Sequence, residues 1–573
     1  MQFTAMYQRS FVKLCLSCIA ALPTSAEQLD SASSADKKYP QQVYWGDTHL
    51  HTSYSFDASM MGNKLLGPAE AYRFARGEEV KTNQGLVAKL SRPLDFLMVA
   101  DHAEYLGLLP KITQQDPDVL KDPTGARWAK LFQQGGDAIW EALFEMHHDI
   151  DTAQPSFKND AVRQSTWQEM IAVADRFNDP GQFTAFAGYE WTTIPGGNNL
   201  HRVVLFADDA SKTGQPLDEA YAKNRQRWEP LYEVTQIKGD GETHPKLSPD
   251  DEFADFERLD KGNLLGTSIK TDDMLPYEYA RSALKLGLQQ AQALGTNPFQ
   301  FGMIGSTDAH TSLAAVAENN YWGKFSIYEP SPTRAGHLAY KKNTSGKLWD
   351  LRNEELSASG YAAVWATENT RDAIFDAMKR REVYATTGSR MVVRFFASDD
   401  FKFDDIDQPN YVARAYEKGV PMGGELARIA DSKSISFLVS AQKDPEGANL
   451  DRIQIVKGWL DADGYTHEKV YDVVWSGSRV PDETGKLPAV GNTVDLDNAT
   501  WQNTIGATQL TTTWNDPDFD PNQSAFYYAR VIEIPTPRWT GYDEQMFDYK
   551  LDRIMPAIVQ ERAYTSPIWY NPQ

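Results

Sequence analysis

Short apolar runs that end in charged or polar residues recur through the first 310 residues of the chain. They lie at residues 94–102 (LDFLMVADH), 183–191 (FTAFAGYEW), 201–207 (HRVVLFA), 230–236 (PLYEVTQ) and 301–310 (FGMIGSTDAH). Stretches with apolar residues at three- and four-residue spacing separate these runs, and that spacing is typical of amphipathic helices. Continuous apolar strands that alternate with helices predict a parallel sheet with helices on its outside.

Four stretches carry the helical period: residues 67–79, 125–150, 165–178 and 275–294. The first has Pro68 at an early position, where the missing N–H costs no intrahelical hydrogen bond. Two of the stretches fall between the strands predicted at 94–102 and 183–191. Residues 105–180 are therefore predicted to form a mostly helical insertion.

Beyond about residue 390 the pattern changes to alternating β-branched and aromatic residues. The segments concerned are 390–398 (RMVVRFFAS), 434–442 (SISFLVSAQ), 450–460 (LDRIQIVKGWL), 469–477 (KVYDVVWSG) and 525–534 (AFYYARVIEI). Turn-forming sequences such as DPEGAN and DADG separate them. This alternation predicts an antiparallel, β-rich C-terminal region over residues 391–573, of the kind found in sandwiches.

The N-terminus has the three parts of a secretion signal over residues 1–26. Arg9 and Lys13 supply positive charge, residues 14–22 form a short apolar run, and residues 24–26 are small. Residues 27–40 are polar and rich in serine, so we expect a flexible leader. No later apolar run reaches the roughly 18 residues that a membrane-spanning helix needs. The expected location is therefore periplasmic or secreted, without a membrane span.

The cysteine positions and the net charge limit which metal ligands and which binding partners the mature chain can have. Both cysteines, Cys15 and Cys18, lie inside the predicted signal, so any metal in the mature chain must be held by His, Asp and Glu. Cleavage would remove Arg9 and Lys13 and take the formal charge from −22 to −24. Such a surface repels nucleic acid and anionic membranes. A small anionic substrate would need a local positive site, such as a bound metal ion; the oligomeric state stays open.

Histidines and carboxylates gather at the predicted strand ends. Six of the 10 histidines of the 573-residue chain lie in or beside these ends. The residues are Asp47, His49, His51, Asp101, His102, Glu190, His201, His244, Asp308 and His310. Each histidine alone is better explained by a structural role, whereas the set together predicts metal binding. In a parallel barrel the carboxyl ends of the strands meet on one face, which carries the active site.

The spacing of these residues suits a metal site. His49 and His51 stand at positions i and i+2 of a strand end and so point to the same side. Neutral imidazoles and carboxylates suit Mn²⁺, Zn²⁺ or Fe. A carboxylate can bridge two ions about 3.5–4 Å apart, and such ions activate water and hold an anionic substrate.

The motifs DTHLHTSYS, VADH, GYEW, HRVVLF and STDAH resemble, in this order, those of the polymerase-and-histidinol-phosphatase (PHP) superfamily. The resemblance implies a distorted (β/α)7 barrel over residues 41–390, carrying the helical insertion, and a site for two or three metals. It also implies phosphoester hydrolysis as the commonest activity. The segments QIKGDGETHP, REVYATTGSR, KDPEGANLDRIQIVKGW and EIPTPRW resemble a branch of exported proteins of uncharacterised function.

The resemblance implies a role for each motif residue. His49 and His51 match the first motif, His102 the second, Glu190 the bridging carboxylate of the third, His201 the histidine after it, and Asp308 and His310 the last. Asp101 would ligate metal or orient His102. Asp57 stands where many members have a histidine, and His244 comes after Glu233, the reverse of the usual order. Two ions are therefore expected, with a third left open.

The sequence thus predicts a secreted multinuclear metal-dependent hydrolase, with phosphoesters as the first substrate class. Asp308 or Glu233 would accept a proton, and Lys238 would bind the substrate anion unless it is an ordinary loop lysine. Hydrolysis of C–N or carboxylic ester bonds is the first alternative, because metal-activated water is not selective for phosphorus. A noncatalytic exported binding protein on the same barrel is the second. The serine-hydrolase motif G-x-S-x-G and the phosphate loop G-x-x-x-x-G-K-[ST] are absent from the sequence.

Overall fold

A mixed sheet of 12 strands forms the centre of the fold, in a computed structural model that describes residues 39–152, 154–193, 200–205, 218–263, 266–343, 346–427 and 434–572. Ten strands form a path in the order β16-β25-β21-β24-β13-β12-β1-β4-β5-β6, and β18 and β19 continue from β21. Within the described strands this path stays open at β16 and β6 and does not close into a barrel. The predicted signal and all but two residues of the predicted leader lie outside the described residues and stay predictions.

The strands of this sheet come from both halves of the chain. Their bounds are β1 Gln42–Leu50, β4 Phe96–Val99, β5 Thr184–Thr193, β6 Leu200–Leu205, β12 Tyr361–Ala366, β13 Val383–Thr386, β16 Glu425–Ala427, β18 Leu450–Leu460, β19 Thr466–Trp475, β21 Ala525–Glu533, β24 Arg562–Thr565 and β25 Ile568–Asn571. Because β13 pairs with β24, the sheet runs continuously from the N-terminal strands into the C-terminal ones.

The predicted parallel arrangement applies to part of the sheet. β1, β4 and β5 pair in parallel, and so do β7 (Leu231–Gln236) and β9 (Gly302–Gly305) of a smaller sheet that also holds β8 (Gly239–Asp240). All four residues of β4 are buried, as parallel strands covered on both faces should be. β5 and β6 are antiparallel instead, because the connection between them has too few residues for a parallel crossover.

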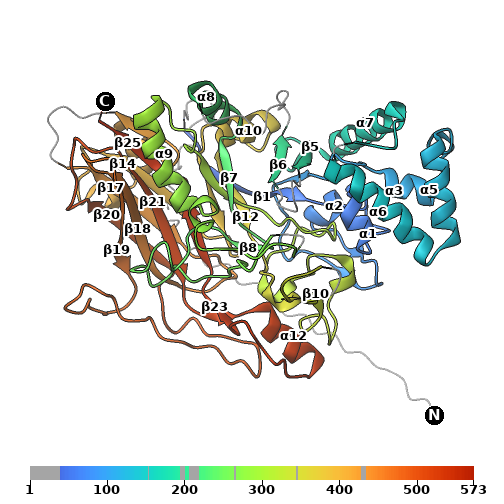
Figure 1. Cartoon of the computed structure of the whole chain (residues 1–573). Coiled ribbons are helices and arrows are strands. Elements are labelled where there is room, and N and C mark those ends of the chain that lie inside the picture. The colour runs from blue at the N-terminus through green and yellow to red at the C-terminus, as the bar shows by residue number, and fades with distance from the viewer. Residues whose placement is uncertain are drawn as a thin grey trace, which may run out of the picture. The chain divides into compact units, whose positions relative to one another are not determined.

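Helices lie between the N-terminal strands, after β1. They are α1 Phe56–Met60, α2 Pro68–Ala75, α3 Leu108–Thr113, α4 Pro117–Leu120, α5 Pro123–Gln134, α6 Asp137–Thr152, α7 Asp160–Phe177 and α8 Glu219–Trp228. The stretch predicted as one helix over 125–150 is two, because Gly135 and Gly136 both adopt positive φ (72° and 55°) and break the helix between α5 and α6. Figure 1 shows α3, α5, α6 and α7 (teal to blue) gathered away from the C-terminal strands (orange to red).

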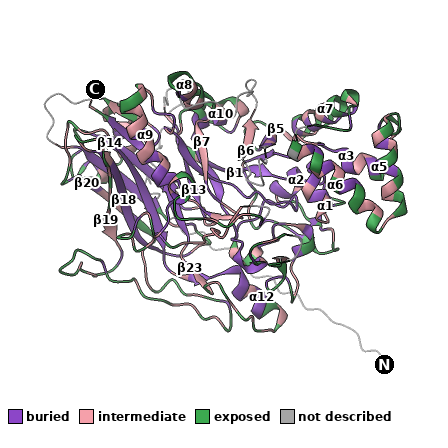
Figure 2. Cartoon of the chain, viewed as in Figure 1, coloured by how far each residue is buried: buried purple, intermediate pink, exposed green. Residues whose placement is uncertain are grey.

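The C-terminal strands are antiparallel, as the alternating pattern predicts, apart from the short parallel pair β16 and β25. A second sheet has the order β15-β14-β17-β20, with bounds Val420–Pro421, Val392–Ser398, Ser436–Gln442 and Gln509–Asn515. Phe437 of β17 packs on Phe395 of β14 and on Tyr527 of β21, with ring centroids 5.5 and 4.5 Å apart. The inner faces of the two sheets therefore share one apolar core, and Figure 2 shows these strands buried.

Shorter elements complete the fold. They are α9 Ala280–Leu294, α10 Arg371–Lys379, α11 Tyr411–Lys418, α12 Trp539–Phe547, β2 Val80–Lys81, β3 Val87–Ala88, β10 Leu338–Tyr340, β11 Leu351–Arg352, β22 Thr536–Pro537, β23 Ile558–Val559 and the 3₁₀ turns η3 Leu275–Tyr277, η4 Glu318–Asn320, η5 Ser326–Tyr328, η6 Asn353–Glu355 and η7 Asp405–Asp407. None of the described helices has the length and apolarity needed to cross a bilayer.

A buried charge network joins α9, β21 and the segment after β8. Arg530 of β21 donates to Glu242 (2.9 Å) and to Asp251 (2.7 Å), and Arg281 of α9 also donates to both carboxylates. All four side chains are almost completely buried. Burial raises the pKa of Asp251, but the two arginines outweigh this and hold it well below its usual value. Each charge is thus compensated only while its partners stay in place.

We expect Arg530→Met to lower the free energy of unfolding by about 3–5 kcal/mol, because it leaves two buried carboxylates with one cation. Urea denaturation followed by circular dichroism measures the change. The control is Lys223→Met, which breaks an exposed ion pair with Glu219 in α8 and should cost less than about 1 kcal/mol. Equal losses in the two variants would contradict the compensating role of the network.

Candidate metal centre

Backbone hydrogen bonds hold the ends of several strands together. The His51 N–H donates to the Ala309 carbonyl oxygen (2.9 Å), and the Asp308 N–H donates to the His49 carbonyl oxygen (2.7 Å). His102 and Glu190 form a parallel bridge in the same way. The register of β1 on β4 shifts between Asp47 and Leu50, a bulge of the kind that turns side chains at functional sites. The motifs found in sequence are thereby brought to one place.

Two buried aspartates brace these strand ends. Asp47 accepts hydrogen bonds from the N–H (3.1 Å) and hydroxyl (2.5 Å) of Thr307, and Asp101 accepts the same pair from Thr52 (2.5 and 2.7 Å). Burial raises the pKa of each aspartate to about 7, against the opposing effect of its hydrogen bonds. Asp101 is predicted to ligate metal or to orient His102. In the structure both of its oxygens accept hydrogen bonds from Thr52 in the loop after β1.

Three groups of side chains present donor atoms suitable for a metal ion. Within each group the donor atoms lie within 4.8 Å of one another. The groups are His49, His51 and Glu190; His102, Glu190 and His201; and His51, Asp57, His102 and His310. Glu190 belongs to the first and second groups, His51 to the first and third, and His102 to the second and third. The described residues can therefore offer adjoining positions for more than one ion.

Glu190 stands at the centre of these groups and directs its two oxygens to different histidines. Oε1 lies 2.6 Å from Nδ1 of His201 and 3.2 Å from Nε2 of His49. Oε2 lies 3.0 Å from Nδ1 of His102 and 3.4 Å from Nε2 of His51. Burial raises the pKa of this carboxyl, but His49 and His102 outweigh the effect and hold it well below its usual value. A carboxylate that divides its oxygens in this way has the geometry of a bridging ligand.

The separations between donor atoms fit ligands around a common ion. Ligand atoms about 2.1 Å from one ion lie about 3.0 Å apart at octahedral angles and about 3.4 Å apart at tetrahedral angles. The Nε2 atoms of His49 and His51 are 3.0 Å apart, and their distances to Glu190 are 3.2 and 3.4 Å. Oε1 of Glu190 and Nε2 of His201 are also buried without a hydrogen bond. The donor set therefore fits a divalent ion such as Mn²⁺, Zn²⁺ or Fe²⁺.

The electrostatics of the centre favour positive charge near His49 and a neutral ring at His51. Burial lowers the pKa of His49, but Glu233, Glu190 and Asp308 outweigh it and raise the pKa well above its usual value. Burial also lowers the pKa of His51, and electrostatic repulsion from His310 adds to the effect. His51 is therefore neutral and has a lone pair to give, while the carboxylates draw positive charge toward His49.

Contacts on the outer ring nitrogens orient the first two histidines. Nδ1 of His49 lies 3.0 and 3.1 Å from the two oxygens of Glu233 in β7, and Nδ1 of His51 lies 2.9 Å from the Ser55 hydroxyl. Such partners fix the ring of a metal-binding histidine and leave the other nitrogen facing the ion. Glu233, one of the two predicted proton acceptors, is thus placed behind His49 rather than among the donor groups.

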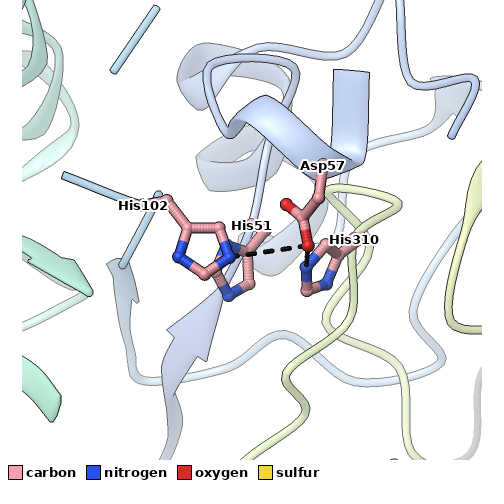
Figure 3. A group of neighbouring side chains, drawn as sticks. All are labelled: His51, Asp57, His102 and His310. Atoms are coloured by element: carbon pink, nitrogen blue, oxygen red, sulfur yellow. Dashed lines mark hydrogen bonds and ion pairs between the residues drawn. The ribbon is translucent and has the colours of Figure 1, made fainter. Parts of the chain in front are cut away.

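Asp57 of α1 closes the third group (Figure 3). Its Oδ2 atom lies 2.6 Å from Nε2 of His310 and 3.5 Å from Nε2 of His102. Burial raises the pKa of Asp57, but the two histidines outweigh it and hold the pKa well below its usual value. The sequence marks Asp57 only by its position six residues after His51.

Two lysines flank Asp308 at the edge of the centre. Nζ of Lys238 is 2.5 Å from Oδ2 and Nζ of Lys324 is 2.7 Å from Oδ1, and the latter oxygen is also 3.4 Å from Nε2 of His51. Asp308 is not part of the three donor groups, although its Oδ1 also lies 3.8 Å from Nε2 of His49. Lys324 is buried and lies in no motif, so sequence analysis did not find it.

His244 lies apart from the donor groups. Its Nε2 is 2.9 Å from a carboxylate oxygen of Asp260, and its Nδ1 accepts the Lys246 N–H at 3.0 Å. Both ring nitrogens are therefore engaged elsewhere. Six of the predicted site residues form the donor groups: His49, His51, His102, Glu190, His201 and His310. Asp101, Asp308 and Glu233 contact or brace these six, and Lys238 contacts Asp308. His244 is the predicted residue that the structure does not bring to them.

The arrangement defines a class of site: a buried cluster of histidines and carboxylates that can hold adjoining metal ions. A family model described as Protein of unknown function (DUF3604) matches residues 38–213 and 208–572, nearly the whole chain. The chain therefore belongs to this family. No curated protein and no solved structure matches the chain. The family description names no activity.

We expect Glu233→Gln to weaken Mn²⁺ or Zn²⁺ binding about 10- to 100-fold, because the amide no longer holds the His49 ring as a carboxylate does. Competition with a fluorescent chelator measures the affinity. Glu229→Gln is the matched control, since Glu229 pairs with Arg202 (2.8 Å) and Arg225 (3.1 Å) instead of a histidine. Unchanged affinity in a folded Glu233→Gln variant would contradict its orienting role.

Proposed function

We propose that the chain is a multinuclear metal-dependent hydrolase whose first substrate class is phosphoesters. The observation that carries this proposal is the buried carboxylate of Glu190, which belongs to two donor groups, one with His49 and His51 and the other with His102 and His201. Two ions would share Glu190, and the group around Asp57 offers a third position. Divalent ions held there would supply Lewis acidity, which lowers the pKa of water and neutralises charge that develops on the substrate.

The chain's own residues would prepare the site for an anionic substrate. Lys238 and Lys324 place two positive charges on either side of Asp308, at the edge of the donor groups. The protein carries a net charge of −22, so an anion needs such a local positive field to approach. This pair of lysines favours phosphoesters over neutral esters and amides as substrates.

The residues proposed for catalysis take distinct roles. Both oxygens of Asp308 face lysines, which suits a group that positions those lysines beside the substrate. Glu233 keeps its side chain 21% exposed while it contacts His49, so it is the more accessible of the two candidate proton acceptors. We therefore assign proton acceptance to Glu233 and substrate binding to Lys238.

The wider relationship proposed is the PHP superfamily, with a distorted (β/α)7 barrel. The parallel pairs β1–β4–β5 and β7–β9 support it, because the motif residues follow these strands in the order expected for that superfamily. A short parallel bridge between Leu50 and Ala309 brings the end of β1 to the segment after β9. The contact between the first and last motifs supports such a barrel.

A screen of the metal-loaded protein against phosphomonoesters, phosphodiesters, carboxylic esters and amides tests the function. We expect turnover of a phosphoester, and a loss of about a hundredfold or more in kcat for His51→Gln, because two donor groups lose a ligand. His467→Gln is the matched control, since that histidine is 44% exposed and pairs with Asp461 in the β18–β19 turn.

The outcome of the screen separates the alternatives. Turnover of esters or amides without phosphoesters would replace the proposed substrate class by the C–N or carboxylic ester class. A protein that binds metal at Glu190 but turns over none of the four classes would be a binding protein. Turnover that survives in His51→Gln would contradict the proposed site.

A further inference from the structure

Thr192 is a buried residue of β5 that follows the GYEW motif and lies outside it. It stands two positions after Glu190, and alternate residues of a strand point to the same face. It is also the direct cross-strand partner of His201 in the antiparallel pair β5–β6. Strand geometry therefore places Thr192 on the face that carries Glu190 and His201.

The hydroxyl of Thr192 lies between two histidines of the metal centre. Its Oγ1 atom is 2.9 Å from Nδ1 of His102 and also 2.9 Å from Nδ1 of His201. The pairing with β6 and a hydrogen bond from its N–H to Oε1 of Glu104 (3.3 Å) hold the backbone of Thr192. The sheet therefore sets the position of the hydroxyl, and the two rings are placed against it.

The chemistry of a hydroxyl lets one threonine serve both rings. Oγ1 has two lone pairs, so it can accept an N–H from each Nδ1 atom at the same time. A neutral histidine with its proton on Nδ1 keeps its lone pair on Nε2, which is then free to bind a metal ion. In His201, Nε2 is buried and has no hydrogen-bond partner among the described residues. This unpartnered nitrogen is a second sign that the ring is held for a ligand.

The other three histidines of the donor groups also have a partner on Nδ1. The pairs are His49 with a carboxylate oxygen of Glu233 (3.0 Å), His51 with the Ser55 hydroxyl (2.9 Å) and His310 with the Asp308 carbonyl oxygen (3.0 Å). Each of these partners serves one ring of the donor groups, whereas Thr192 serves two. Loss of its hydroxyl would therefore release two histidines together.

We propose that Thr192 is a positioning residue that orients His102 and His201 for one of the two ion positions that share Glu190. Both histidines belong with Glu190 to one donor group, whereas the other group that contains Glu190 includes neither of them. Removal of the hydroxyl should therefore weaken one ion position and leave the other intact. This inference rests on the proposed function, because it concerns the same pair of ions.

Substitution of Thr192 by valine keeps the shape of the side chain and removes the hydroxyl. We expect Thr192→Val to weaken binding of one Mn²⁺ ion about 10- to 100-fold and to leave the other within about twofold of the wild type, as loss of a partner of metal-binding histidines should. Isothermal titration calorimetry of the full chain with Mn²⁺ measures both affinities.

Electron paramagnetic resonance gives a readout that does not depend on activity. With two equivalents of Mn²⁺, the wild type should show the signal of a coupled pair, because ions that share a carboxylate lie about 4 Å apart or less. Thr192→Val under the same conditions should show the signal of isolated ions.

Two further variants separate the hydroxyl from a general effect on the fold. Thr192→Ser keeps the hydroxyl, so both affinities should stay within about threefold of the wild type. Thr184→Val is the matched control, because Thr184 is also buried in β5 and its hydroxyl donates to Asn369 (2.7 Å), which belongs to no donor group. It should bind both ions as the wild type does, and circular dichroism verifies that all three variants fold.

Wild-type affinity for both ions in a folded Thr192→Val variant would overturn the proposal. An equal loss in Thr184→Val, or a loss in Thr192→Ser as large as in Thr192→Val, would also overturn it, and so would a wild type that binds fewer than two ions.

These outcomes are separate from those of the activity screen. A wild type that binds both ions but turns over none of the substrate classes would contradict the hydrolase and leave the role of Thr192 intact. Turnover of a phosphoester together with unchanged metal binding in Thr192→Val would do the reverse.

Discussion

The buried carboxylate of Glu190 is the constraint on which the rest of the site depends. A carboxylate taken out of water is strongly unfavourable unless positive charge or hydrogen bonds compensate it. Here four histidines surround it, and their distances of 2.6–3.4 Å match those of ligands that share an ion. The scaffold must therefore hold four histidines and one carboxylate from three different parts of the chain within one small volume.

The fold meets this demand through paired strand ends. β1, β4 and β5 run in parallel, so the side chains that follow them come to the same edge. Asp47 holds the loop after β9, and Asp101 holds the loop after β1, each through a threonine that gives two hydrogen bonds. These braces let a sheet that remains open, and that mixes parallel with antiparallel strands, still present a convergent site.

The sequence predicted those parts of the site that follow strand ends. The H-x-H pair at His49 and His51 was found because a strand period places both rings on one side. Lys324 was not found, and Asp57 was noted only as standing in the place of a histidine, because a loop and a helix start bring them in through tertiary contacts without a local pattern. The antiparallel pairing of β13 with β24 likewise depends on contacts across nearly 180 residues. Asp101 and His244 show that residue type and position do not reveal which partner a side chain finds.

Anomalous diffraction from crystals of the Mn²⁺-loaded protein tests the bridging role of Glu190 most directly. The account predicts two anomalous peaks beside the Glu190 carboxylate, one next to His49 and His51 and the other next to His102 and His201. A peak near Asp57 and His310 would add the third ion. The absence of any peak within about 3 Å of the Glu190 carboxylate would contradict the central claim.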